Sequence, residues 1–200
     1  MKKITSLFLI LFFQNIYSQN INEKLDKVNT IEEAEKFVTD NSELIPAIFN
    51  ISPEIDTLVP TSFKALKIGN IFNESGNTFK VLSVNKGKAF RVSYVYLDGS
   101  KLSMNEINKL RPKIIKEYRK GIKFSELAKK YTMDTNLTGE LNWFLEGMMY
   151  TEFENSIKAH TLGEIYTVDI PSEKWYYVVL KTHNEKEVTN ITMLKVKSSS

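Results

Sequence analysis

The 200-residue sequence contains no cysteine and only two histidines, His160 and His183. Without cysteine the chain can form no disulfide, bind no metal through thiolates and use no cysteine nucleophile, and two histidines leave little for a histidine-rich metal centre. We therefore expect neither a metal nor another cofactor. Basic and acidic residues nearly balance, at 27 and 24. The strongly basic surface that nucleic-acid binding requires is therefore not expected.

Long hydrophobic runs are scarce, and the one at the start is short. Lys2 and Lys3 precede an almost unbroken apolar run over residues 4–13, and Ser18 ends the following polar stretch. This order predicts a secretory signal peptide over residues 1–18. The alternative is a buried helix or membrane anchor, but the run has about half of the ~20 residues that span a bilayer. We expect a periplasmic or secreted mature chain without a membrane anchor, and a chain without cysteine suits an oxidising compartment.

The rest of the chain has a globular composition, 42% hydrophobic and 26% charged, so a folded core is expected. In residues 19–88, Thr30 and Glu33 form a capping-box pattern that begins a short helix. Residues 79–84 alternate as in a β-strand, and residues 85–88 predict a turn. These 70 residues form an N-terminal segment of helices and strand.

The second half predicts an α+β domain over residues 89–183. Residues 90–97 are rich in β-branched and aromatic side chains, which indicates a central strand. A second capping box, Ser103 with Glu106, begins a helix that Gly121 can end. The remaining expectations are helices over 123–131 and 151–159 and strands over 165–170 and 175–181. Residues 184–200 are expected to form an edge strand and a tail.

An internal repeat becomes visible when the sequence is aligned with itself at an offset of 94 residues. Between residues 31–72 and 125–166 there are ten identical pairs, where about two or three would arise by chance. The repeat predicts that residues 19–88 are a degenerate, partial copy of the later domain. This copy lacks a counterpart of the strand at 90–97, because that position falls within or beside the signal peptide.

Four motifs in residues 90–182 resemble the parvulin (rotamase) family of peptidyl-prolyl cis-trans isomerases. In chain order they read GIKFSELAKKYTMD from Gly121, GELNWF from Gly139, GMMYTEFE from Gly147 and LGEI from Leu162. The family patterns are G-x-x-F-x-x-L-A-x-x-[YF]-S-x-D, G-G-D-L-G-W-F, G-x-M-x-x-x-F-E and L-x-x-G-E-[IV]. The resemblance implies a small antiparallel sheet flanked by helices, with a shallow apolar groove that binds an X-Pro peptide.

The resemblance also implies the residues of this groove. Leu141, Met149 and Phe153 fall on the positions that hold the proline ring, and Asp134 falls on the position beside the amide where the family has Asp or Cys. The alternative for the three apolar residues is ordinary core packing, because such side chains often share one helix face. The alternative for Asp134 is a loop or capping carboxylate.

Two departures from the family concern its histidines. The first strand, where the family has S-H-I-L, here has Tyr94 in place of the histidine, and the last strand has Tyr176 there. A tyrosine pair can still form hydrogen bonds through its hydroxyls but loses the imidazole tautomers. Plain strand packing is the alternative for both. His160 and His183 match neither motif histidine and are expected at the surface.

The resemblance and the signal peptide together predict an extracytoplasmic peptidyl-prolyl isomerase that assists the folding of exported proteins. Its expected partners are unfolded or proline-containing polypeptides. The alternative is a catalytically weak chaperone or peptide-binding module, which the loss of both histidines favours. A structural subunit of a secretion machine has no positive feature in the sequence.

Overall fold

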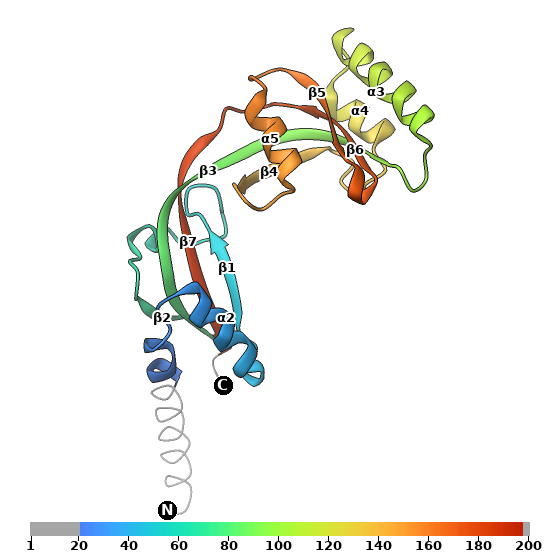
Figure 1. Cartoon of the computed structure of the whole chain (residues 1–200). Helices are drawn as coiled ribbons and strands as arrows, with labels where there is room; N and C mark the ends of the chain where they lie inside the picture. Colours follow the sequence, from blue (N-terminus) through green and yellow to red (C-terminus); the bar gives the residue numbers. More distant parts are fainter. Residues whose placement is uncertain (1–20, 198–200) are drawn as a thin grey trace, which may run out of the picture. The chain divides into compact units, whose positions relative to one another are not determined.

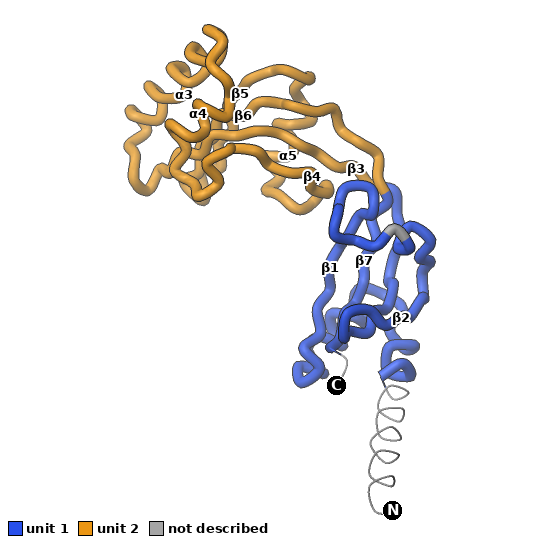
Figure 2. Tube along the Cα trace, turned by 180° about the vertical axis from the view of Figure 1, so that it is seen from behind, with its two compact units in different colours: residues 1–86, 189–200 blue, residues 87–188 orange. Residues whose placement is uncertain are grey.

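The computed structural model describes residues 21–197, which divide into two compact units (Figures 1 and 2). Unit 1 comprises residues 21–86 and 189–197, and unit 2 comprises residues 87–188. The last strand thus belongs with the N-terminal segment. The predicted signal peptide, residues 1–18, lies outside the described residues. In the part of the chain that is described, no helix has both the length and the apolar character needed to cross a bilayer.

Unit 1 begins with a helical stretch at residues 21–26, followed by helix α2 (Ile31–Asp40). The predicted capping box is confirmed. The hydroxyl of Thr30 accepts the Glu33 N–H at 3.1 Å, and the Glu33 carboxylate accepts the Thr30 N–H at 3.2 Å. The remaining elements before the hairpin are η1 (Ser42–Leu44), β1 (Ala47–Ile51) and η2 (Thr61–Ala65).

The sheet of unit 1 contains strands from both ends of the chain. Strand β2 (Ile71–Glu74) forms a hairpin with the start of β3 (Asn77–Asp98), and β7 (Lys186–Lys197) lies between β1 and β3. The expectation that residues 184–200 contain an edge strand is therefore wrong. Ile191 and Met193 are buried in one apolar cluster and Leu194 in another. A strand buried on both faces is typical of the interior of a sheet.

Strand β3 runs without interruption through residues 85–88, where the sequence predicts a turn. Because β7 and β6 (Trp175–Leu180) both pair with β3, ladder hydrogen bonds outweigh the local turn preference of this polar stretch. The first half of β3 belongs to unit 1 and the second half to unit 2.

Unit 2 has the predicted α+β architecture, with a small antiparallel sheet flanked by helices. Strand β4 (Glu140–Leu145) and β6 each pair with the second half of β3, and β5 (Ile165–Ile170) pairs with β6. The other elements are α3 (Met104–Arg119), α4 (Phe124–Tyr131), α5 (Thr151–Ala159) and η3 (Pro171–Glu173). The capping box of Ser103 and Glu106 at the start of α3 is confirmed.

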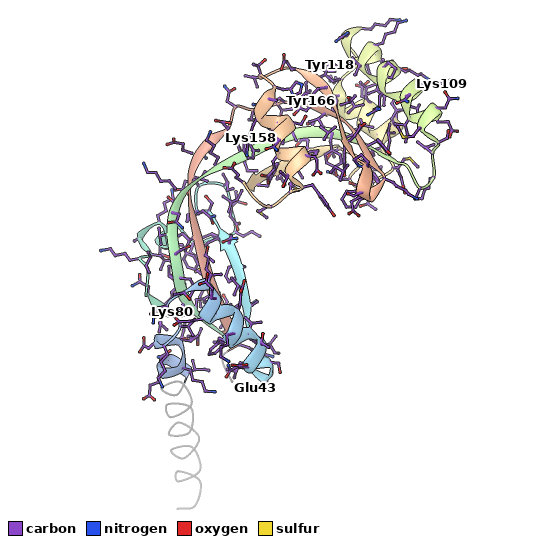
Figure 3. The ribbon with its side chains drawn as sticks, viewed as in Figure 1. Glu43, Lys80, Lys109, Tyr118, Lys158 and Tyr166 are labelled. Carbon is purple, nitrogen blue, oxygen red and sulfur yellow. The ribbon has the colours of Figure 1, made fainter. Side chains whose placement is uncertain are left out.

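Alternation along β3 separates the two faces of the unit 2 sheet. Tyr94 lies in a cluster with Phe153 of α5, whereas its neighbour Val95 lies in the cluster of α3 and α4. In that second cluster Tyr118 of α3, labelled in Figure 3, packs edge-on against Phe124 of α4 with ring centroids 6.0 Å apart. The face toward α5 carries the pocket.

Candidate active site

A pocket of about 320 Å³ opens on the α5 face of unit 2. Five of the six residues predicted for the site line it. The lining residues are Tyr94, Asp134, Leu141, Met148, Met149, Tyr150, Phe153, Ile170, Trp175 and Tyr177. Apolar and aromatic side chains therefore surround one carboxylate, a composition common in sites that bind small apolar groups.

Tyr94 and Asp134 form the polar part of the pocket. The Tyr94 hydroxyl donates to the Asp134 carboxylate at 2.5 Å, and the Asn136 side-chain amide donates to the Tyr94 oxygen at 3.4 Å. The backbone beside Tyr94 is held by Gly139, whose carbonyl accepts the Tyr94 N–H at 2.7 Å. Gly139 has a φ of +66°, and a Cβ there would lie 2.4 Å from the Tyr94 carbonyl oxygen, so this close approach requires glycine.

The loop after α4 places Asp134 next to Tyr94 through contacts with β3. The Met133 N–H donates to the Tyr96 carbonyl at 2.9 Å, and the Thr132 hydroxyl accepts the Tyr96 N–H at 3.2 Å. The loop therefore continues the hydrogen bonding of the strand edge. Its position is fixed on both sides of the carboxylate, since Asn136 also donates to the Glu140 carbonyl at 2.9 Å.

The Tyr94 and Asp134 pair is electrostatically matched. Burial and the hydrogen bond to Asp134 raise the pKa of Tyr94 to about 12. The same hydrogen bond is the main cause of a lowered pKa for Asp134. At neutral pH the site therefore contains a neutral phenol that donates to an ionised carboxylate.

The three residues predicted for the proline shelf lie together in the pocket lining. Leu141 lies on β4, Met149 precedes α5 and Phe153 lies on its first turn. The carboxylate of Glu154, only 5% exposed, accepts the Met149 N–H at 3.0 Å and the Gly147 N–H at 2.9 Å. This buried carboxylate fixes the turn that carries Met149, a role that the sequence pattern did not indicate.

The prediction for the last strand is wrong by one residue. Tyr176 packs in the cluster of α3 and α4, on the opposite face from the pocket. Tyr177 lines the pocket instead, with its ring centroid 6.0 Å from that of Tyr94 and 5.3 Å from that of Phe153. Burial raises the pKa of Tyr177, so this phenol is neutral across the physiological range.

Neither histidine belongs to the pocket lining. His160 is half-buried and stacks on Tyr166, with ring centroids 3.7 Å apart, and His183 packs edge-on against Trp143. Both are thus less exposed than the sequence predicted. Residues 21–197 contain no group of three or more metal-ligating side chains.

The geometry suits catalysis by binding rather than by bond formation. Rotation about a prolyl C–N bond has a barrier of ~18–20 kcal/mol, because the planar amide has partial double-bond character. A site lowers this barrier when it binds the twisted amide better than either planar form. Leu141, Met149 and Phe153 can hold the ring, while the Tyr94 and Asp134 pair can interact with the adjoining peptide group.

Comparisons with known proteins agree with this geometry. The family described as the PPIC-type PPIASE domain matches residues 77–185, which is more than half of the chain. The foldase protein PrsA of Geobacillus kaustophilus (strain HTA426) is 34% identical over 71 residues, covering 34% of this chain and 25% of PrsA.

Two solved structures are also similar to this chain. The peptidylprolyl isomerase PrsA of Bacillus anthracis is 25% identical, with a TM-score of 0.41, and the match covers 51% of this chain and 44% of PrsA. A SurA-like chaperone of Campylobacter jejuni is 18% identical, with a TM-score of 0.37, over 99% of this chain and 61% of the chaperone. This chain thus spans less than half the length of either PrsA protein that it matches. Through the matched segment, which contains the whole pocket, the chain belongs to the parvulin family of PPIC-type peptidyl-prolyl isomerase domains.

Proposed function

We propose that the protein is an extracytoplasmic peptidyl-prolyl cis-trans isomerase that assists the folding of exported polypeptides. The observation that carries this proposal is the pocket itself. An apolar shelf and a Tyr94–Asp134 hydrogen bond of 2.5 Å lie together in the segment that matches the isomerase family. The extracytoplasmic location is supported by the charged, apolar and small-residue order of residues 1–18.

The roles of the residues follow from their positions. Leu141, Met149 and Phe153 bind the proline ring, and Asp134 with Tyr94 acts on the amide that rotates. Tyr177 lines the pocket, with its ring centroid 6.0 Å from that of Tyr94. An ionised Asp134 at the pocket makes a phosphorylated residue before proline an unfavourable substrate, because like charges repel.

The decisive experiment measures prolyl isomerisation of short X-Pro peptides by the purified protein. We expect Asp134→Ala and Met149→Ala to lower turnover about 10-fold or more, in line with the usual contribution of a positioned group. The matched pair Tyr177→Ala and Tyr176→Ala tests the assignment on β6. Both are tyrosines on one strand, but only the first should change KM and kcat in a protein that remains folded.

Equal turnover in all of these variants would remove the site assignment. Absence of turnover in the folded wild-type protein would instead contradict the isomerase activity. Circular dichroism and urea unfolding of each variant separate loss of function from loss of fold.

A peptide-binding chaperone with little catalysis is the second candidate. The observation that favours it is that two tyrosines, Tyr94 and Tyr177, and neither histidine line the pocket. A phenol with a raised pKa has no second tautomer with which to exchange donor and acceptor roles. This candidate predicts that the protein suppresses aggregation of an unfolded protein while peptide turnover stays at the uncatalysed rate.

A further inference from the structure

The pocket is larger than a proline ring requires. Its volume is about 320 Å³, whereas an apolar cavity of ~150 Å³ accommodates a benzene ring. The site therefore has room for about two groups of ring size. Leu141, Met149 and Phe153 are three of its ten lining residues.

The lining of the same pocket also includes Met148, Tyr150 and Trp175. Met148 is 58% exposed and Tyr150 is 43% exposed, so both present apolar surface to an incoming chain. The rings of Tyr150 and Trp175 meet edge to face at 5.2 Å, and Tyr96 packs perpendicular to Trp175 at 6.4 Å. Tyr150 and Trp175 therefore contribute aromatic surface to the pocket lining.

These side chains are held in place before any ligand arrives. Glu154 fixes the backbone of the turn that carries Met148 and Tyr150, through hydrogen bonds of 2.9 and 3.0 Å to Gly147 and Met149. A pre-ordered site loses less conformational entropy on binding. Exposed methionine and aromatic side chains on a fixed turn are therefore suited to binding rather than to packing alone.

We propose that Met148, Tyr150 and Trp175 form a subsite for the aromatic side chain of a residue that adjoins the proline. The proposal rests on the proposed function, which places the proline ring on the Leu141, Met149 and Phe153 shelf. An aromatic ring in this subsite gains edge-to-face and sulfur contacts. An acidic side chain there is disfavoured, because Glu173 lies at the Tyr150 hydroxyl and Asp134 lines the same pocket.

The test uses two series of peptides, one with an aromatic residue directly before proline and one with an aromatic residue directly after it. Each is compared with the peptide that has alanine at both positions. An aromatic pair contributes about 0.5–1.5 kcal/mol, so kcat/KM should rise about 2- to 12-fold in one of the two series. Trp175→Ala should abolish this ratio, which compares two peptides on the same variant. Trp143→Ala is the matched control, because Trp143 lies on β4 and packs against His183. A ratio that survives Trp175→Ala, or a wild type with no aromatic preference, overturns the subsite.

Binding separates this proposal from the isomerase proposal. In Trp143→Phe the remaining tryptophan is Trp175, whose fluorescence reports peptide binding directly, since the chain has two tryptophans. Tighter binding of aromatic peptides without turnover supports the subsite and contradicts the isomerase. Turnover without any aromatic preference in rate or binding supports the isomerase and contradicts the subsite.

A second inference concerns unit 1, whose sheet repeats that of unit 2. The strand order in unit 1 is β1, β7, β3 and β2, and in unit 2 it is β4, β3, β6 and β5. In both units the first strand of the order pairs antiparallel with the second, and the last two form a hairpin. In each unit the chain also runs through a helix, a strand and a short helix before it reaches the two strands of the hairpin.

Hydrogen bonds coincide at the offset of 94 residues found in the sequence. Gly69 and Gly163 both have a φ of +86°. The Gly69 N–H donates to the Val81 carbonyl at 2.9 Å, and the Gly163 N–H donates to the Lys181 carbonyl at 2.8 Å. The two acceptors, Val81 and Lys181, are 100 rather than 94 residues apart, because η3 lengthens the second hairpin.

The residues beside these glycines form equivalent turns. The Asn70 N–H donates to the Lys67 carbonyl at 3.0 Å, and the Glu164 N–H donates to the Thr161 carbonyl at 3.1 Å. In each case the side-chain oxygen of the later residue accepts the N–H of the earlier one, at 2.8 and 2.6 Å. Identical turns, glycine conformations and strand orders are difficult to obtain by independent convergence on such short segments.

We infer that unit 1 is a divergent copy of the isomerase fold, the first of two along the chain, in which β7 takes the place of the missing first strand. The 22-residue β3 is then the last strand of the first copy joined directly to the first strand of the second. At the offset of 94, Ala47, Ile55 and Val59 stand where the shelf has Leu141, Met149 and Phe153. Ala47 and Val59 are smaller than the side chains at the equivalent shelf positions, and we therefore expect one isomerase site per chain.

The test moves β7 in the chain. Residues 189–197 are placed before residue 21 through a flexible linker of about 12 or about 18 glycine and serine residues, and the chain ends at Val188. The order of the isomerase fold is thereby restored in unit 1. We expect hydrogen-exchange protection of the Gly69 and Val81 amides to match that of the original protein, whereas a scrambled strand in the same place should lose it. Lack of protection with both linkers, while unit 2 remains protected, overturns the inference.

Discussion

The hydrogen bond between Tyr94 and Asp134 should be measurable as a coupling free energy. A hydrogen bond to a charged group contributes about 1.5–3 kcal/mol. Asp134 is only half-buried and its second carboxylate oxygen keeps donors at 3.3 and 3.4 Å, from Thr135 and Asn136. Solvent screening and these alternative donors reduce the expected coupling to about 1–1.5 kcal/mol.

The assay is a double-mutant cycle of Tyr94→Phe and Asp134→Ala, with the free energy of unfolding measured in urea. The coupling should depend on pH in acid because the pKa of Asp134 is lowered in the folded protein. A lowered pKa stabilises the fold above the unfolded value of about 3.9, and this contribution is lost as the pH falls through the folded pKa.

In alkali the pH dependence has the opposite sign, so that stability falls as the pH rises. Tyr94 has a folded pKa of about 12, whereas an unfolded tyrosine ionises near pH 10. Its contribution is thus complete below about pH 10 and is lost as the pH rises through about 12. A coupling within ~0.3 kcal/mol of zero at neutral pH, or one that does not weaken in acid, refutes this account of the pair.

Three further substitutions test how the site is supported, each by urea unfolding. Gly139→Ala should destabilise the protein by about 2 kcal/mol, since its Cβ would lie 2.4 Å from the Tyr94 carbonyl oxygen at a φ of +66°; wild-type stability would refute the close approach. Glu154→Ala should cost about 2–3 kcal/mol and raise KM, because two backbone amides lose their acceptor; an unchanged KM would argue against its role in placing the turn. Lys181→Met should cost about 1–2 kcal/mol, since its buried ammonium donates to two carbonyls at the end of α5, at 2.9 and 2.8 Å; a neutral effect would show that water replaces it.

Local sequence signals predicted the local structure well. Both capping boxes form as expected, because the pairs Thr30–Glu33 and Ser103–Glu106 satisfy backbone groups within one helical turn. Asp134 is a different case: only the resemblance to the parvulin motif implied its place in the site, since its partner Tyr94 lies 40 residues away in the chain. Where a hydrogen bond joins near neighbours in the chain, a motif contains most of the information.

Which residues of β6 face the pocket could not be predicted from local patterns. Residues 175–180 read WYYVVL, an unbroken apolar and aromatic run that is packed on both sides of the sheet. Such a strand has no polar alternation to indicate which residues share a face, and a shift of one residue exchanges the faces. Pairing of Val179 with Tyr94 sets the register in the structure, and this long-range contact is absent from any local pattern.

The position of β7 escaped the sequence analysis for a related reason. Its alternation suggested a strand with one solvated face, and nothing in residues 188–197 indicates that β1 lies beside it. Pairing between segments that are more than one hundred residues apart depends on the complete fold. Pairing of β7 and β6 with β3 likewise explains why residues 85–88 remain extended.

The place of β7 also determines when each part of the protein can be completed. A chain emerges from the ribosome with its N-terminus first, so every residue of unit 2 becomes available before β7 does. Until residues 189–197 arrive, β1 and the first half of β3 lack the strand that lies between them, and unpaired strand edges are prone to join other chains. Unit 1, most of which is synthesised first, is therefore the last to have all of its strands. Unit 2, which contains the pocket, can fold before the central strand of unit 1 has been synthesised.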